Sequence, residues 1–543
     1  MSQPSPATPT AGPKSLMQRT LDVIEAVGNR VPHPVIIFLI LIAAVLVLSF
    51  LLEWAGAQVS YQVINPETHA VETTTTQARS LLSSDGLRHM YTRLVPNIMG
   101  FGAIGLLIAA MIGVGVAEES GLVNALIRQL VVVSPARLLV YILAFVGILS
   151  SIAADAGYLV LIPLAGTAFL SVGRHPLAGI ALGFAAVAGA FTVNMLIKPL
   201  DAVLTEITND AIHMVDPTKS IDLTANLWFS FVSVPFLTVV IGLITDRVIE
   251  PRLGKYVPGP GADPPEPGPD TPAGASAAAA AAQAAASPDG TPGPLSPAES
   301  RGLRYALYAF VGVLAVFALL TLPPGAPLRN PDTGSLIGNS PFMNGLITVI
   351  MLAFLATGIA YGRGAGTLTT TGQIIAAMTK AVSGLGGTIL LFVVIAQFID
   401  YFNFSNIPTL LAVSMADALK AANVGPLPLL VGFIVVVLLL DFVFTPAIAK
   451  WAIFAPVFVP LFVQLGVDPA SVLAAYRIGD SPPNAITPLN AYFALVVGFA
   501  QRYDKNAGIG TVVALMLPYV FWLSVLWTVL FVAWYLLGLP WGL

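Results

Sequence analysis

The chain has 543 residues, of which 56% are hydrophobic and only 10% are charged. Because soluble proteins carry roughly a quarter of charged residues, this chain lacks the polar side chains that a water-exposed surface needs, and we predict a polytopic membrane protein. A net charge of −4 without a basic tract argues against a nucleic-acid partner, and the absence of cysteine excludes disulfides and thiol nucleophiles. The sequence contains neither HExxH nor GxxxxGK[ST], so we expect no zinc site, no ATP hydrolysis and no cofactor.

Apolar stretches of membrane-spanning length follow a Pro/Ser/Thr-rich tail at residues 1–33. The first stretch is too long for the core of a signal peptide, so we interpret it as a retained membrane span. We predict about nine transmembrane helices in an all-α fold, at 34–54, 97–117, 176–198, 227–248, 303–322, 342–361, 384–402, 426–444 and 511–539.

Three further apolar regions are interrupted by Pro, Gly and carboxylates, namely 138–172, 446–466 and 484–500. Such residues are tolerated at membrane depth only where the backbone lines a cavity walled by protein. We therefore expect re-entrant hairpins or broken helices here.

A segment rich in Pro, Ala and Gly, residues 251–300, divides the predicted membrane domain into two halves, 34–250 and 301–543. This segment is too poor in large apolar residues to fold alone, and we predict a disordered cytoplasmic linker. Each half carries an aspartate eight residues before a proline, Asp155 before Pro163 and Asp480 before Pro488. This weak repeat favours two related halves, each with one hairpin, as many transporters have.

The distribution of Lys and Arg predicts the orientation. Basic residues flank the linker, and the loop at 199–226 is acidic, which suits the outer side. We expect the N-terminus in the cytoplasm and the C-terminus in the periplasm.

The first constellation of polar residues lies in the predicted first hairpin. Asp155 stands in an apolar run among Ala and Gly, a few residues after Ser150 and Ser151. A carboxylate at membrane depth costs a few kcal/mol unless it is solvated, paired or protonated. This predicts a hairpin tip that binds an ion, with a helix cap at the membrane surface as the alternative.

The second constellation crowds polar groups into a Pro-broken stretch. Arg477 and Asp480 have the spacing of an ion pair within one helical turn, and oxygen ligands for a cation follow at Ser481, Asn484 and Thr487. The alternative is an ordinary surface loop.

The third constellation follows the apolar run of 434–440. Asp441 ends this run, Pro446 interrupts the helix, and Lys450 and Trp451 follow. We interpret Lys450 as a side chain that reaches the membrane interface, and Trp451 as an interfacial anchor or as a stacking surface for an aromatic substrate. A buried Asp441 suits ion or proton exchange.

A smaller group ends the predicted span at 176–198. Asn194 lies deep enough to be a ligand, whereas Lys198 and Asp201 are predicted to mark the interface.

Several segments resemble the p-aminobenzoyl-glutamate transporter (AbgT) family. The similar segments are 449–460, 475–481, 500–511, 153–164 and 194–201. The resemblance implies a homodimeric secondary transporter with nine spans and two re-entrant hairpins, which takes up the folate catabolite p-aminobenzoyl-glutamate or exports sulfonamide-type drugs by alternating access. The functional positions of the family carry over to Asp155, Trp451, Pro469, Arg477 and Asp480.

Two departures from the family concern the coupling ion. Asp441 replaces an Asn, and Pro483-Asn484 replaces Thr-Asn, at positions that resemble proposed sodium ligands. The coupling ion is therefore sodium or a proton.

We thus expect a transporter of an aromatic carboxylate in a bacterial inner membrane, with Arg477 attracting the carboxylate and Trp451 stacking on the ring. A sodium/dicarboxylate symporter and, more remotely, an intramembrane aspartyl protease are the alternatives.

Overall fold

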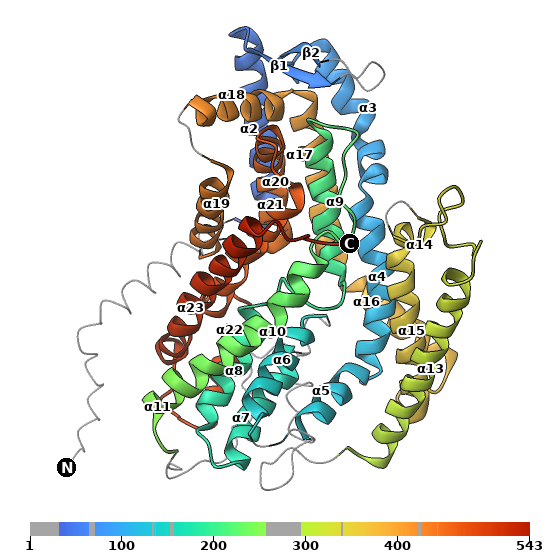
Figure 1. Ribbon diagram of the computed structural model, residues 1–543, viewed down its shortest axis with the longest axis vertical. Helices are drawn as coiled ribbons and strands as arrows, with labels where there is room; N and C mark the ends of the chain where they lie inside the picture. The colour runs from blue at the N-terminus through green and yellow to red at the C-terminus, as the bar shows by residue number, and fades with distance from the viewer. Residues whose placement is uncertain are drawn as a thin grey trace, which may run out of the picture.

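A computed structural model describes residues 32–64, 71–132, 135, 137–152, 157–256, 295–337, 340–421, 425–442 and 444–543 (Figure 1). Asp155, most of the N-terminal tail and most of the linker lie outside these residues. The predicted all-α membrane fold is confirmed: within the described chain, eight helices are long and apolar enough to cross a membrane.

The long helices agree with most of the predicted spans. They are α2 (Pro34–Trp54), α3 (Ser84–Gly100) continued by α4 (Gly102–Glu119), α10 (Leu227–Ile244) continued by η2 (Thr245–Ile249) and α11 (Glu250–Leu253), α13 (Pro297–Thr321), α15 (Leu346–Ala365), α17 (Gly386–Phe404), α20 (Ala447–Gln464) and α23 (Ile509–Leu536).

Shorter helices lie between them. These are α5 (Leu122–Val132), α6 (Leu139–Ser150), η1 (Gly157–Leu161), α7 (Ile162–Ser171), α8 (Pro176–Ala188), α9 (Pro199–His213), α14 (Pro341–Asn344), α16 (Thr371–Ser383), α18 (Ile407–Ala421), α19 (Pro426–Asp441), α21 (Pro469–Asp480), η3 (Pro482–Ala485) and α22 (Phe493–Gln501).

Two predicted elements are wrong. The span at 176–198 is a helix of only 13 residues that ends at Ala188. The region 446–466, predicted to be interrupted, forms the continuous helix α20 with Pro456 and Pro460 inside it. Prolines are tolerated within membrane helices because neighbouring groups satisfy the carbonyls that they free.

A β-hairpin was not predicted from the sequence. Strands β1 (Gln58–Ile64) and β2 (Val71–Gln77) pair antiparallel, with Gln58 opposite Gln77. The strands lie beside α18 at one end of the molecule (Figure 1). Their β-branched Val, Ile and Thr residues favour extended backbone.

The main hydrophobic core joins α6–α10 to α17 and α19–α23. A peripheral group, α4, α13, α15 and α16, packs through smaller apolar clusters. Small residues allow its helices to approach closely: a Cβ on Gly113 would lie 2.3 Å from the carbonyl oxygen of Met351, and one on Gly358 would lie 2.8 Å from Ala117.

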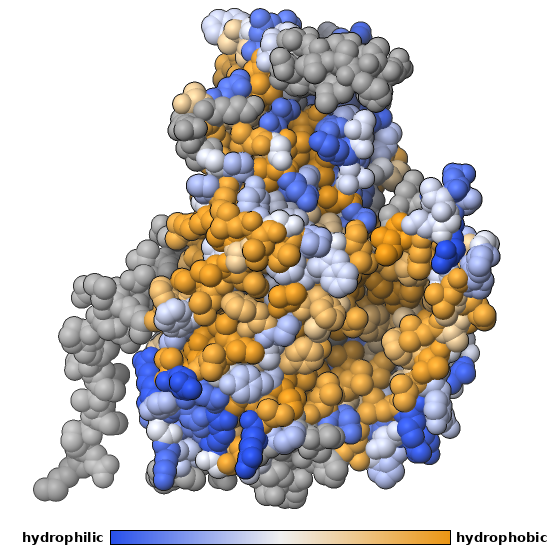
Figure 2. Space-filling view, viewed as in Figure 1, coloured by the Kyte–Doolittle hydropathy of each residue, from blue (hydrophilic) through white to orange (hydrophobic). Residues whose placement is uncertain are grey.

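The distribution of apolar residues on the molecular surface fits a protein that spans a bilayer. Apolar residues cover the middle of the face seen in Figure 2, whereas hydrophilic residues gather toward its lower edge and around its upper part. Helix α13 fits this surface, because only 6% of its most apolar window is buried inside the protein.

A similar order of helices, interrupted by one break, occurs twice. In the first half, α6 and α7 precede α8, a break at 189–198, and α9. In the second half, α19 and α20 precede α21, a break at 481–492 that contains η3, and α22. The Asp-to-Pro repeat does not match this order, because Pro163 begins α7 whereas Pro488 lies in the second break.

Candidate functional site

The two helix breaks meet inside the protein. Thr192 belongs to the first break and Ser481 to the second, and their hydroxyls are hydrogen-bonded to each other. The Thr192 hydroxyl also lies 3.0 Å from the carbonyl oxygen of Arg477, which belongs to the last turn of α21. Prolines at Pro199, Pro482 and Pro483 fit these breaks, since proline donates no backbone hydrogen bond and begins helices readily. Unwound backbone of two discontinuous helices is the setting in which transporters build binding sites.

Arg477 is held by the first break and by α9. Its guanidinium donates to the carbonyl oxygen of Thr192 at 2.6 Å, to Asp201 Oδ1 at 2.6 Å and to Asn226 Oδ1 at 3.1 Å. The predicted pair of Arg477 with Asp480 is therefore replaced by a pair with Asp201. The Asp201 side chain is 12% exposed and also accepts from the Lys198 backbone N–H, so it lies inside the protein rather than at the interface.

A second charged cluster lies at the same end of α21, around its last residue, Asp480. Lys450 Nζ forms ion pairs with Asp441 Oδ1 and, at 2.7 Å, with Asp480 Oδ1. All three side chains are at most 1% exposed. The predicted interfacial role of Lys450 is wrong, because two carboxylates from other helices retain its ammonium in the interior. Isolated charges are too costly to bury, so such groups occur paired.

Polar neighbours complete this cluster. Asn484 Nδ2 donates to Asp441 Oδ2 at 3.1 Å and to the backbone carbonyl of Asp480. The Tyr476 hydroxyl lies 2.9 Å from Asp480 Oδ1 and 2.6 Å from the Ala447 carbonyl oxygen. Among the described residues, Asp480 Oδ2 is buried without a hydrogen-bond partner.

Trp451 connects the cluster to α9. Its indole is fully buried, donates to Thr208 Oγ1 at 3.0 Å, and lies with its ring centroid 4.5 Å from that of Tyr476. An interfacial anchor keeps part of its ring in the headgroup region, so full burial excludes that role here. The Tyr476 ring therefore packs against the Trp451 ring inside the protein.

Asn194 joins the first break to the end of α6. Its amide donates to the Leu149 carbonyl oxygen at 2.9 Å and lies 3.1 Å from Ser151 Oγ. The hydroxyls of Ser150 and Ser151 bond back to carbonyl oxygens of their own helix, at 2.7 and 2.9 Å. Lys198 is 2% exposed and reaches Ser151 and a carbonyl of the break, so it does not mark the interface either.

Pro469 and Thr487 lie apart from these contacts. Pro469 begins α21 and lines a cavity of about 360 Å³ together with Lys219 and Asp468. Thr487 is buried and accepts a hydrogen bond from the Leu489 backbone N–H at 3.3 Å.

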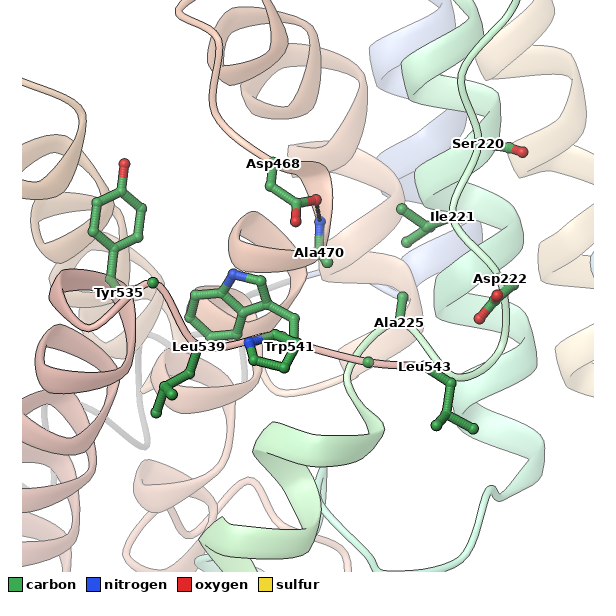
Figure 3. A pocket seen from close by; sticks show the side chains of 13 residues that line it. Ser220, Ile221, Asp222, Ala225, Asp468, Ala470, Tyr535, Leu539, Trp541 and Leu543 are labelled. Atoms are coloured by element: carbon green, nitrogen blue, oxygen red, sulfur yellow. Dashed lines mark hydrogen bonds between the residues drawn. The ribbon is translucent and has the colours of Figure 1, made fainter. Parts of the chain in front are cut away.

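A neighbouring cavity of about 550 Å³ shares Asp468 with the first and extends to the C-terminal segment (Figure 3). In Figure 3, Asp222 and Asp468 line it from two different connections, and Trp541 lies below Asp468, next to Leu539. Ala225 and Ala470 are part of its wall. The amide of Asn226 bridges this wall to Arg477, because it donates to the Ala470 carbonyl oxygen at 2.8 Å and accepts from the guanidinium.

Sequence reasoning missed Asp201, Asn226 and Tyr476 as members of the site. The signal for Asp201 was present, since it ends the segment 194–201 that resembles the family. No local pattern marks Asn226 or Tyr476, whose partners come from distant parts of the chain.

A helical membrane protein whose discontinuous helices meet around buried charges has the architecture of a transporter. The sequence model of the AbgT putative transporter family matches residues 19–264 and 275–543, and the chain belongs to this family. It is a multi-pass membrane transporter and not an enzyme, which removes the aspartyl protease alternative.

Relatives of known name and structure agree. The p-aminobenzoyl-glutamate transport protein of Escherichia coli (strain K12) is 32% identical over 519 residues, 96% of this chain and 95% of that protein. The YdaH transporter of Alcanivorax borkumensis superposes with a TM-score of 0.83 at 40% identity, over 94% of this chain and 100% of its own. MtrF of Neisseria gonorrhoeae, described within a class of antimetabolite efflux pumps, gives a TM-score of 0.84 at 34% identity, over 95% of this chain and 97% of its own.

Proposed function

We propose that this protein is an ion-coupled secondary transporter that moves p-aminobenzoyl-glutamate or a related aromatic carboxylate across the bacterial inner membrane. One observation carries this proposal: Arg477 binds a carboxylate, that of Asp201, where the two helix breaks meet. A guanidinium is a planar fork that matches a carboxylate, so the site already has the chemistry that an anionic substrate needs.

The substrate carboxylate would take the place of Asp201 on Arg477. An exchange of one carboxylate for another keeps the buried guanidinium neutralised, and a buried charge is strongly destabilising when it loses its partner. Tyr476 precedes Arg477 in α21, and Trp451 lies on α20 with its ring against that of Tyr476. These two rings supply the aromatic surface for a benzoyl ring. The name of the Escherichia coli relative supports this class of substrate.

The cavities at the start of α21 suit an outer approach to this site. Pro469 and Arg477 stand two helical turns apart on α21, about 12 Å at 1.5 Å per residue. Sliding of the short helices against the peripheral group α4, α13, α15 and α16 would then expose the site to one side at a time, in a homodimer with a cytoplasmic N-terminus and a periplasmic C-terminus.

Coupling is proposed to run through the buried carboxylates Asp441 and Asp480, with sodium or a proton as the ion. Both carboxylates lie beside the turn of α21 that carries Arg477. A change of charge at Asp441 or Asp480 would therefore alter the electrostatic potential at Arg477.

Uptake into proteoliposomes tests this function. We expect radiolabelled p-aminobenzoyl-glutamate to accumulate under one imposed gradient, sodium or proton, and Asp441→Asn to reduce that accumulation. Uptake of radiolabelled succinate that p-aminobenzoyl-glutamate does not inhibit, without accumulation of p-aminobenzoyl-glutamate itself, would contradict the aromatic assignment and favour the dicarboxylate alternative.

Export of sulfonamide-type antimetabolites is a second candidate, favoured by the similarity to MtrF. The same vesicles loaded with a sulfonamide test it. Efflux of the sulfonamide without any uptake of p-aminobenzoyl-glutamate would make export the function.

A further inference from the structure

Three charged side chains converge from the ends of three helices. Asp441 and Asp480 are the last residues of α19 and α21, and Lys450 lies in the first turn of α20. Carboxylates are disfavoured at helix C-termini and ammonium groups at N-termini, because the helix dipole opposes both. None of the three positions stabilises its own helix. The placement of the three charges therefore serves the ion pairs that they form with one another.

The convergence of two helix C-termini and two carboxylates makes a strong point of attraction for a cation. Both Oδ1 atoms are directed at one atom, Lys450 Nζ, which lies 2.7 Å from that of Asp480 and closer to that of Asp441. The ammonium therefore lies where a bound cation would meet both carboxylates.

The other oxygens predicted to bind a cation face elsewhere. Ser481 Oγ donates to the carbonyl oxygen of Arg477 at 2.8 Å, and Thr487 Oγ1 accepts from a backbone N–H. Asn484 presents its Nδ2 donor, not its oxygen, to Asp441. A hard cation such as sodium needs several oxygen ligands around one point, and these residues do not form that set.

We propose that the Lys450 ammonium is a built-in cation that fills the place of a coupling sodium, so that transport by this protein needs no sodium. The proposal rests on the proposed function insofar as it identifies the coupling ion, but occupancy of the centre is measurable without transport. Removal of the ammonium is expected to open its place beside Asp480 to a sodium ion.

Lys450→Met together with Asp441→Asn is the main variant. Wild type buries two carboxylates and one ammonium here, and the double variant buries one carboxylate, so both have a formal charge of −1. The charge match guards against unfolding, whereas Lys450→Met alone leaves two unpaired carboxylates. Lys380→Met, which removes an exposed lysine paired with Glu119, is the control.

Thermal unfolding of the full-length proteins in detergent, in sodium chloride against choline chloride of equal ionic strength, gives the first measurement. A ligand that binds only the folded state raises the unfolding temperature with its concentration. We expect a sodium-specific rise in the double variant and none in wild type or Lys380→Met. A sodium-specific rise in wild type, or none in the double variant, would overturn the proposal.

Transport gives the second measurement. Wild-type uptake is expected to be the same within twofold in sodium and in choline, and uptake that falls more than fivefold in choline contradicts the built-in cation. If neither p-aminobenzoyl-glutamate nor a sulfonamide is transported under any gradient, the proposed function fails, while the unfolding measurements still decide the role of Lys450.

Discussion

Arg477 Nη1 lies 2.6 Å from Asp201 Oδ1, although the two residues are 276 positions apart in the chain. The pair joins α21 to the first turn of α9 and so crosses between the two halves. The Asp201 carboxylate therefore binds the guanidinium of Arg477 where we propose that the substrate carboxylate binds.

Asp201→Asn is expected to separate binding from turnover. Removing the competing carboxylate frees the guanidinium, so p-aminobenzoyl-glutamate should bind to purified protein at least as tightly as it binds to wild type. Transport should fall at least tenfold, because the variant lacks the Asp201 carboxylate that displaces the substrate from Arg477 and so allows its release. The unpaired buried charge should also cost about 3–5 kcal/mol of stability in the unliganded protein.

Arg477→Lys is the matched variant for this prediction. Lysine keeps the charge and loses the planar fork, so binding and transport should both fall. Equilibrium binding and proteoliposome uptake measure the two quantities, and an Asp201→Asn protein that binds more weakly than wild type would argue against the exchange.

Trp451 provides a test of the aromatic surface. Trp451→Phe keeps a ring beside Tyr476 but loses the donor to Thr208, so we expect a fewfold rise in KM with folding preserved. Trp451→Ala leaves a cavity in a fully buried position, at a cost of about 3–5 kcal/mol. Thr208→Val removes the acceptor, together with the bond from the Thr208 hydroxyl to the Leu204 carbonyl oxygen, and is the control for the lost hydrogen bond. Uptake kinetics with an aliphatic acyl-glutamate as competitor complete the measurement, and equal KM values for Trp451→Phe and Trp451→Leu would exclude stacking.

Long apolar helices were predictable because their composition suffices. The run at 34–54 coincides with α2, since twenty apolar residues have no other stable environment than the bilayer. The span at 176–198 failed for the opposite reason. Its second part carries polar residues such as Thr192, which bonds to Ser481 and Arg477 across the protein instead of continuing α8.

The charged members of the site show the same limit. Asp441, Arg477 and Asp480 stood out because they interrupt apolar sequence, and the structure places all three inside. Lys450 and Asp201 were instead predicted to lie at the membrane interface, and the structure buries both in ion pairs. Their partners lie on other helices, and only the packing of α9, α20 and α21 brings them together.

His175 predicts a pH dependence of stability outside the spanning helices. It caps α8, accepting from the Leu177 backbone N–H at 3.3 Å. Burial lowers the pKa of His175, and the nearby carboxylates of Glu250 and Asp504 offset this only in part. The unfolded chain then binds more protons than the folded protein near the ordinary histidine pKa of about 6.5, so stability is highest above that pH and falls as the pH drops through it.

His175→Asn keeps a capping side chain and removes the titrating group. We expect unfolding temperatures in detergent to fall less between pH 7.5 and 5.5 for this variant than for wild type. His33→Asn replaces a cap of the same geometry at an exposed position and is the control, expected to retain the wild-type slope. A wild-type slope in His175→Asn as well would assign the acid sensitivity to other groups.

Gly479 tests how closely the helices that carry Asp441 and Asp480 must approach. A Cβ at Gly479 would lie 2.7 Å from the Ile434 carbonyl oxygen and from Val437 Cβ, both on α19. Gly479→Ala must therefore push α19 away from α21, at a cost of about 1–3 kcal/mol.

Gly432→Ala on the exposed side of α19 is the matched control, since its Cβ meets no atom within 4 Å and alanine favours a helix. We expect Gly479→Ala to lower both the unfolding temperature and uptake, and Gly432→Ala to leave uptake unchanged with an equal or higher unfolding temperature. Because the two aspartates end these helices, displacement of α19 also separates them from Lys450. Gly479→Ala should then show a sodium-specific stabilisation that wild type lacks, and a loss of uptake without that stabilisation would mean that the close approach serves packing alone.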